Sequence, residues 1–203
     1  MSVPRWSPPV ELNEAEEFIA SRLKRTGKLY VFLRRHRSEL FDDAFQAELE
    51  AMYSDAPHGT APLPPALLAM VTLLQAYQQS SDAAAVENAV FDRRWQMVLD
   101  GLDTEAPLFS QGVLVDFRLR LIEHDMDRRL VEKTVDLAKA TGDFGYKALR
   151  VALDSAPLWG AEGRGRLAHM GVGQPRPAGD QASAQGRARR AGTRSRAGHR
   201  AGP

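Results

Sequence analysis

The chain has 203 residues, of which 43% are hydrophobic and 26% charged, as expected of a soluble protein with one ordinary core. It has no cysteine, which excludes a disulfide framework, a thiolate metal site and a thiol nucleophile and fits a reducing cytoplasm. The start, MSVPRWSPPV, lacks the features of a signal peptide, and no apolar run is long enough to cross a membrane. We therefore expect a cytoplasmic protein without a membrane partner.

The net charge of +1 is unevenly distributed. Residues 161–203 contain nine Arg, no Lys and two acids, so the first 160 residues carry six more acidic than basic side chains. Thirty of those last 43 residues are Arg, Gly, Ala or Pro, a composition that predicts a disordered tail. We expect this tail to be translated in a wrong reading frame, because out-of-frame translation of a GC-rich gene produces this mixture of residues. The alternative is a genuine basic arm that adds nonspecific DNA affinity.

Helical periodicity dominates the first half of the chain. Asn13 and Glu16 form a plausible capping box for a helix that ends before Gly27, and residues 28–40 mix apolar and basic positions. A short amphipathic helix follows Asp42 or Asp43 as its cap. After the proline-rich loop at 54–65, a helix is expected over 64–79.

The same period continues in the second half. A helix is expected from Asp82 to about residue 92, with its apolar face continuing to Gly101, and a long helical stretch from Ser110 to Gly142. Only residues 148–154, ALRVALD, resemble a strand. The expected fold is mainly α: a helical bundle, then a single strand, then the tail.

A group of basic residues without an intervening acid suggests a DNA-binding surface, because phosphates must be neutralised by such clusters. Its members are Arg22, Lys24, Arg25, Lys28, Arg34, Arg35 and Arg37. The helices at 64–79, at 82–92 and from Ser110 are compatible with a helix-turn-helix-like arrangement, in which Arg118 and Arg120 are further candidate contacts. A solvated charged face, or an interface with an acidic partner, explains the same pattern.

Asp154 is the acid most suggestive of chemistry, because it ends the strand-like segment directly before a Ser-Pro-containing turn. Strand ends hold carboxylates rigidly and hard cations take oxygen ligands, although an aspartate capping the turn is the simpler explanation. The five histidines lack metal-site spacing, and nucleotide-binding and hydrolase motifs are absent from the sequence.

The arrangement resembles transposases of bacterial insertion sequences that combine an InsH-type N-terminal helical domain with an RNase H-like DDE catalytic domain. Four segments carry the resemblance: FLRRHRSELFDDAFQAELEAMY at 32–53, PPALLAMVTLLQAYQQSSDAAAVENAVFDRRWQMVLDGLD at 64–103, FRLRLIEHD at 117–125 and ALDSAPLWGA at 152–161. The resemblance implies that the helical domain recognises terminal inverted repeats and that Asp154 is the first acid of the catalytic triad. An intact enzyme would use Asp154 and two further acids to hold two Mg²⁺ or Mn²⁺ ions.

Beyond Asp154 the only acids are Glu162 and Asp180, and both fall in the predicted disordered tail, so we expect a chain that lacks catalytic activity and needs no cofactor. The expected organisation is a DNA-binding helical domain at 10–145, the start of a truncated catalytic domain at 146–161, and the tail at 162–203. The expected function is binding of DNA at insertion-sequence ends. The alternatives are an interaction domain that associates with itself or with intact transposase, and a pseudogene product without function.

Overall fold

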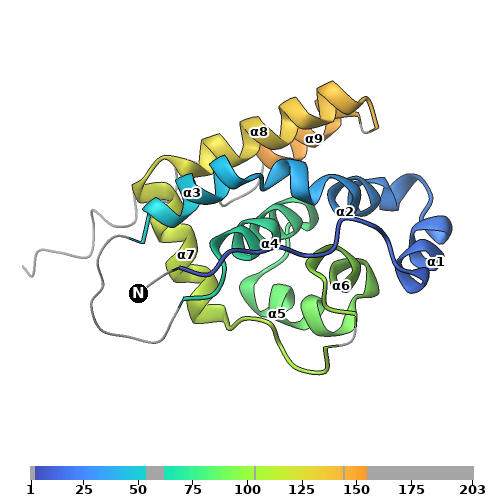
Figure 1. Cartoon of the computed structure of the whole chain (residues 1–203), viewed down its shortest axis with the longest axis horizontal. Coiled ribbons are helices and arrows are strands. Elements are labelled where there is room, and N and C mark those ends of the chain that lie inside the picture. The colour runs from blue at the N-terminus through green and yellow to red at the C-terminus, as the bar shows by residue number, and fades with distance from the viewer. Residues whose placement is uncertain (1–2, 54–61, 103, 144, 155–203) are drawn as a thin grey trace, which may run out of the picture. The chain divides into compact units, whose positions relative to one another are not determined.

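The computed structural model describes residues 3–53, 62–102, 104–143 and 145–154, and these residues all belong to one compact unit. Its centre is α4 (Pro65–Gln78), whose residues from Pro65 to Ala76 are all buried. A helix that is apolar on every side is stable only when other elements surround it. The helices that pack directly on α4 are α3, α5, α6, α7 and α9, and Figure 1 shows α4 in the middle of the unit.

The N-terminal helices form one side of the unit. In chain order they are α1 (Glu14–Arg22), the 3-10 turn η1 (Arg25–Gly27), α2 (Lys28–Leu40) and α3 (Asp43–Ala51). The buried face of α2 packs against α6 and α8, and α1 packs against α6. The corner from α1 through η1 into α2 therefore rests on the core but presents its outer side to solvent.

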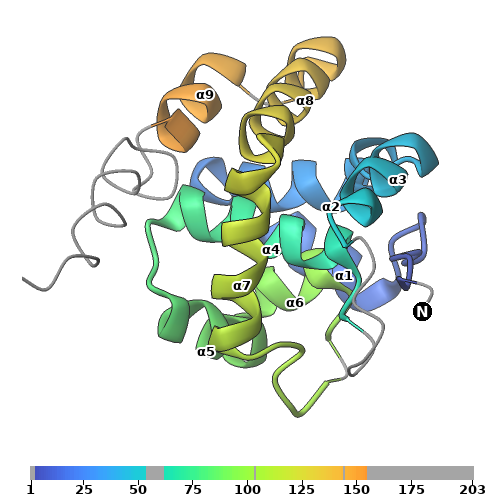
Figure 2. The same cartoon turned by 90° about the vertical axis from the view of Figure 1, so that its left-hand side faces the viewer.

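The remaining helices complete the enclosure of α4. They are α5 (Asp82–Phe91), α6 (Arg93–Leu99), α7 (Gln111–Glu123), α8 (Met126–Thr141) and α9 (Tyr146–Asp154). Figure 2 shows α7 in front of α4, with α8 continuing upward from its end. The expected mainly helical fold is confirmed, and the described residues contain no strand.

Side-chain caps set the helix starts that the sequence indicated. Asn13 and Glu16 form the expected capping box, in which the Asn13 side chain accepts from the Glu16 N–H at 2.9 Å and the Glu16 carboxylate accepts from the Asn13 N–H at 2.9 Å. Asp42 caps α3 and Ser110 caps α7, each through a side-chain oxygen that accepts from the N–H three residues further on. These contacts satisfy N–H groups that have no partner within a helix.

Two expected continuous stretches are each divided into two helices. Asp92 ends α5 and caps α6, accepting from the N–H of Arg94 at 2.8 Å. Asp125 separates α7 from α8 with a φ of 53°, a left-handed conformation that aspartate tolerates better than most residues. The apolar period continues across both breaks, which is why periodicity alone did not locate them.

The strand expected at 148–154 is wrong, because these residues belong to α9. A strand would place Leu149, Val151 and Leu153 on one face, but Leu149 and Leu153 are each 1% exposed and Val151 is 66% exposed. That pattern has helical spacing, and α9 packs on α4 and α8. Residues 146–154, expected to open a second domain, instead join the helical core. The tail and the remaining resemblance at 155–161 lie outside the described residues.

Candidate nucleic-acid interface

Arg34 and Arg37, two of the seven basic residues proposed for DNA, are core residues. The Arg34 side chain is 1% exposed and its guanidinium donates to both carboxylate oxygens of Glu16, at 2.6 and 2.7 Å. It also donates to the carbonyls of Val10 and Glu11, at 3.0 and 2.6 Å. Arg34 therefore fastens α2 to α1 and to the segment before it, and its charge is not available to phosphate.

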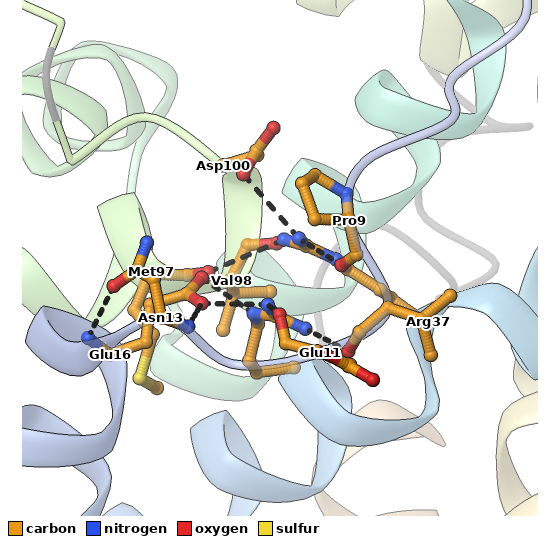
Figure 3. A network of polar contacts seen from close by, with 10 residues as sticks. Pro9, Glu11, Asn13, Glu16, Arg37, Met97, Val98 and Asp100 are labelled. Carbon is orange, nitrogen blue, oxygen red and sulfur yellow. Dashed lines mark hydrogen bonds and ion pairs between the residues drawn. The ribbon is translucent and has the colours of Figure 1, made fainter.

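Arg37 lies one turn further along α2 and also connects this helix to other parts of the chain (Figure 3). Its guanidinium donates to the carbonyl of Val98 at 3.0 Å, at the end of α6, and to that of Pro9 at 2.9 Å. The last carbonyls of a helix lack intrahelical partners, and Arg37 satisfies one of them from a neighbouring helix. Burial, with Arg34 as a second cause, lowers the pKa of Arg37 to about 10, and it stays charged at neutral pH.

Sequence spacing contained a signal for this burial. Tyr30, Leu33, Arg34, Arg37 and Leu40 recur at intervals of three and four residues, which places both arginines on the apolar face of α2. Charge alone predicts one continuous basic surface, whereas the apolar spacing separates these two arginines from the other five basic residues. Its partner Glu16 is 18 residues away in the chain and could not be paired with Arg34 by spacing.

Arg118 and Arg120 on α7 also differ from expectation. Arg118 forms a two-pronged ion pair with Asp82 of α5, one prong at 2.8 Å, and donates to the side chain of Gln75 at 3.1 Å. The hydrogen bond from Arg118 is the main reason that the pKa of Asp82 is lowered. Arg118 thus joins three helices, whereas Arg120 is exposed and lies over the ring of Tyr53 at 4.9 Å.

The other five members of the basic run are exposed at the corner formed by α1, η1 and α2, and we call them the corner patch: Arg22, Lys24, Arg25, Lys28 and Arg35. No ion pair within 4.0 Å joins any of them to an acid among the described residues. Arg22 lies over the exposed ring of Phe18, with 5.1 Å between guanidinium carbon and ring centroid. Five cationic groups are therefore directed to solvent within one corner.

The corner has a defined shape. Lys28 and Arg35 are seven residues apart on the same side of α2, and both line a hollow of about 210 Å³ together with Leu23, the C-cap of α1. A Cβ placed on Gly27 would lie 2.7 Å from the Cβ of Leu23, so glycine permits the close approach of the turn to α1.

Among the described residues, Asp143 is the one acid that lines this hollow, and it accepts a hydrogen bond from His36. The distance from His36 Nε2 to the Asp143 carboxylate is 2.9 Å, and His36 Nδ1 lies 3.0 Å from Glu39. Burial lowers the pKa of His36, but the hydrogen bonds to Asp143 and Glu39 outweigh it and leave that pKa above its ordinary value. Two basic side chains, Lys28 and Arg35, and one acid, Asp143, line the hollow, so its formal charge is positive.

The first two helices of the helix-turn-helix-like arrangement expected around Ser80 follow one another directly. α4 and α5 are joined by Gln79, Ser80 and Ser81, with Gln79 at a φ of 53°. A recognition helix needs basic or amide side chains that reach base edges. α5 (DAAAVENAVF) has neither Lys nor Arg, and its one asparagine donates to Gln78 at 3.1 Å.

Asp154 is the last residue of α9 rather than the end of a strand. A two-metal site requires several carboxylates that converge on the ions. Within the described ranges, no group of three or more His, Asp or Glu side chains could hold a metal ion. These residues do not fit the Mg²⁺ or Mn²⁺ centre of an intact enzyme. Among the same residues, no helix is both long and apolar enough to span a bilayer.

Comparison with protein families decides the affiliation of the chain. The family model described as "Transposase domain (DUF772)" matches residues 19–120. The chain belongs to this transposase-domain family. The matched part of the transposase domain runs from the second half of α1 to most of α7 and contains the whole corner patch. No curated protein and no solved structure matches the chain.

Proposed function

We propose that this transposase-domain protein binds DNA through the corner patch. The observation that carries the proposal is the exposure of five basic side chains, free of ion-pair partners among the described residues, at one corner of a domain whose family is transposase-related. Each lysine or arginine that neutralises a phosphate releases a bound counterion, so a compact group of cations is an effective site for duplex DNA.

The acidic balance of the rest of the domain favours the corner patch as the surface that contacts DNA. The first 160 residues carry six more acids than bases, so most of the surface repels a polyanion. α1 itself is divided, with Glu14, Glu16 and Glu17 in its first turn and Arg22 in its last. We propose that the phosphate backbone contacts the Arg22 end of α1, the turn η1 and the outer side of α2, rather than α5.

The finer proposal is that the DNA is the terminal inverted repeat of an insertion sequence. Phosphate contacts orient a protein on the duplex, and the exposed Arg35 beside the hollow is our candidate for reading a base edge. We further propose that this chain alone does not cleave or join DNA. From residue 154 to 203 the sequence contains only the acids Asp154, Glu162 and Asp180, and the last two lie in the Arg/Gly/Ala/Pro-rich segment, which lacks the apolar alternation of a catalytic domain that could hold two metal ions.

The test measures fluorescence anisotropy of a labelled duplex titrated with the full chain. One variant replaces all five corner-patch residues by Gln, and a matched control replaces five exposed basic residues elsewhere: Arg93, Arg128, Arg129, Lys139 and Lys147. Both variants lose five charges, and both retain the arginines of residues 161–203. We expect the corner variant to bind about a hundredfold more weakly at low salt. Equal losses in the two variants would refute the assigned surface.

The same anisotropy assay tests specificity for the DNA sequence. An unlabelled duplex carrying the terminal repeat of the element that encodes the chain should displace the probe at lower concentration than a scrambled duplex of equal length. Equal displacement would leave DNA binding intact but contradict the proposed recognition of element ends.

A further inference from the structure

Three exposed apolar side chains form a strip along α7. Val115, Leu119 and Ile122 are 37%, 51% and 41% exposed. At 3.6 residues per turn, these three side chains lie within about 60° of one another around the helix. The opposite side of α7 is filled by the buried Leu114 and Phe117, so the strip is a second apolar face rather than an extension of the core. Figure 2 shows this helix at the front of the unit.

Charges without an ion-pair partner among the described residues lie on one flank of the strip. Asp116 and Arg120 are four residues apart on the same flank and both are exposed. No ion pair within 4.0 Å joins them, and Arg120 instead lies over Tyr53. On the other flank, Arg118 is already bound to Asp82. The unpaired acid and base therefore lie beside the apolar strip, separated by one helical turn.

This arrangement is self-complementary under a two-fold axis. When two copies of a helix pair antiparallel, the same flank of each faces the other, and a residue before the centre meets one after it. With the axis near Arg118, Asp116 of one copy meets Arg120 of the other, and the reciprocal pair forms by symmetry. The apolar strips meet in the same geometry, with Val115 beside Ile122 of the other copy.

The geometry points to a second copy of this chain as the occupant of the α7 strip, in an antiparallel two-fold dimer. The apolar area is small, so the dimer is weak and forms at micromolar or higher concentration. Figure 1 places α7 and α1 at opposite ends of the unit, which leaves both corner patches accessible in the dimer. Two copies can then hold two DNA segments at once. The dimer itself does not depend on DNA binding.

Sedimentation velocity of the full chain over a range of concentrations tests the dimer. The sedimentation coefficient of the parent should rise with concentration, and Leu119→Ser should abolish that rise. Phe18→Ser is the matched control, because Phe18 is also an exposed apolar residue, at 62%, but lies on α1. It should behave as the parent. A parent that stays monomeric, or a dimer indifferent to Leu119→Ser, overturns the inference.

Charge reversal tests the antiparallel geometry separately. Asp116→Arg and Arg120→Asp each create like-charge pairs across the axis, and each should weaken association about tenfold or more. The double exchange D116R/R120D restores opposite charges and should return the dissociation constant to within about twofold of the parent. Failure of the double exchange to recover association contradicts the pairing. Dimerisation through residues outside the described part would respond to none of these substitutions.

Discussion

Glu16 is predicted to be the most sensitive single charge in the unit. Its side chain is 3% exposed, and the Arg34 guanidinium that donates to both of its oxygens is 1% exposed. Burial raises the pKa of Glu16, but the hydrogen bonds from Arg34 and from the Asn13 backbone outweigh it and leave that pKa below its ordinary value. Glu16→Gln keeps the shape of the side chain and an oxygen for the Asn13 N–H, while leaving the charge of Arg34 uncompensated.

The expected loss follows from burial on both sides of the pair. Removing one partner of a buried ion pair costs about 3–5 kcal/mol, because the remaining charge stays desolvated. Arg34 retains the carbonyls of Val10 and Glu11, so we expect the lower end, about 3 kcal/mol. Domains of this size are stable by only about 5–15 kcal/mol, which makes the loss conspicuous. The exposed neighbour Glu17→Gln serves as the control, with a change within about 0.5 kcal/mol.

The assay is urea unfolding of the full chain followed by far-ultraviolet circular dichroism at neutral pH. The midpoint should fall for Glu16→Gln with an unchanged slope, since the folded core is the same. The lowered pKa of Glu16 means that its contribution is present above the unfolded pKa and is lost on acidification, so parent and variant should converge at low pH. A loss below about 1 kcal/mol at neutral pH would refute the claim that this pair stabilises the junction of α1 and α2.

Three further predictions concern single residues. Protonated His36 contributes stability that is fully present below its ordinary pKa and is lost as the pH rises through its raised folded-state pKa, so His36→Gln should lower the urea midpoint at mildly acidic pH and progressively less as the pH rises; an effect that grows with pH would contradict the assigned pairing with Asp143. Arg118→Gln should lower the unfolding free energy by about 1–3 kcal/mol and leave DNA affinity unchanged, whereas weaker DNA binding by the folded variant would return Arg118 to the interface. Gly27→Ala should cost about 1–3 kcal/mol in urea unfolding because its methyl group meets Leu23, and a neutral result would show that the turn yields easily.

Local signals predicted the helix starts well, because capping depends on residues three positions apart. Asn13 with Glu16 and Ser110 before an apolar period mark helix N-termini that the structure confirms. The breaks at Asp92 and Asp125 were less visible, since one residue in a suitable conformation divides a helix without disturbing its apolar spacing.

The candidate site was harder to predict, because it depends on which charges are already paired. Arg34 and Arg35 are adjacent and chemically identical in the sequence, yet one is buried against Glu16 and the other is exposed beside the hollow. Their partners come from distant parts of the chain. The strand expected at 148–154 failed for a related reason: a short apolar run fits a strand or a buried helix, and packing on α4 and α8 decides between them.

The salt dependence of DNA binding tests the central claim most directly. Each phosphate contact contributes about −0.9 to the slope of log K against log salt, so loss of the five corner-patch cations should make the slope shallower by about 3–4.5. The full chain is used for the parent, the corner variant and the control variant, because the arginines at 161–203 then contribute equally to all three. The account predicts a shallower line for the corner variant and a change below about 1 for the control. Parallel lines for parent and corner variant would contradict it.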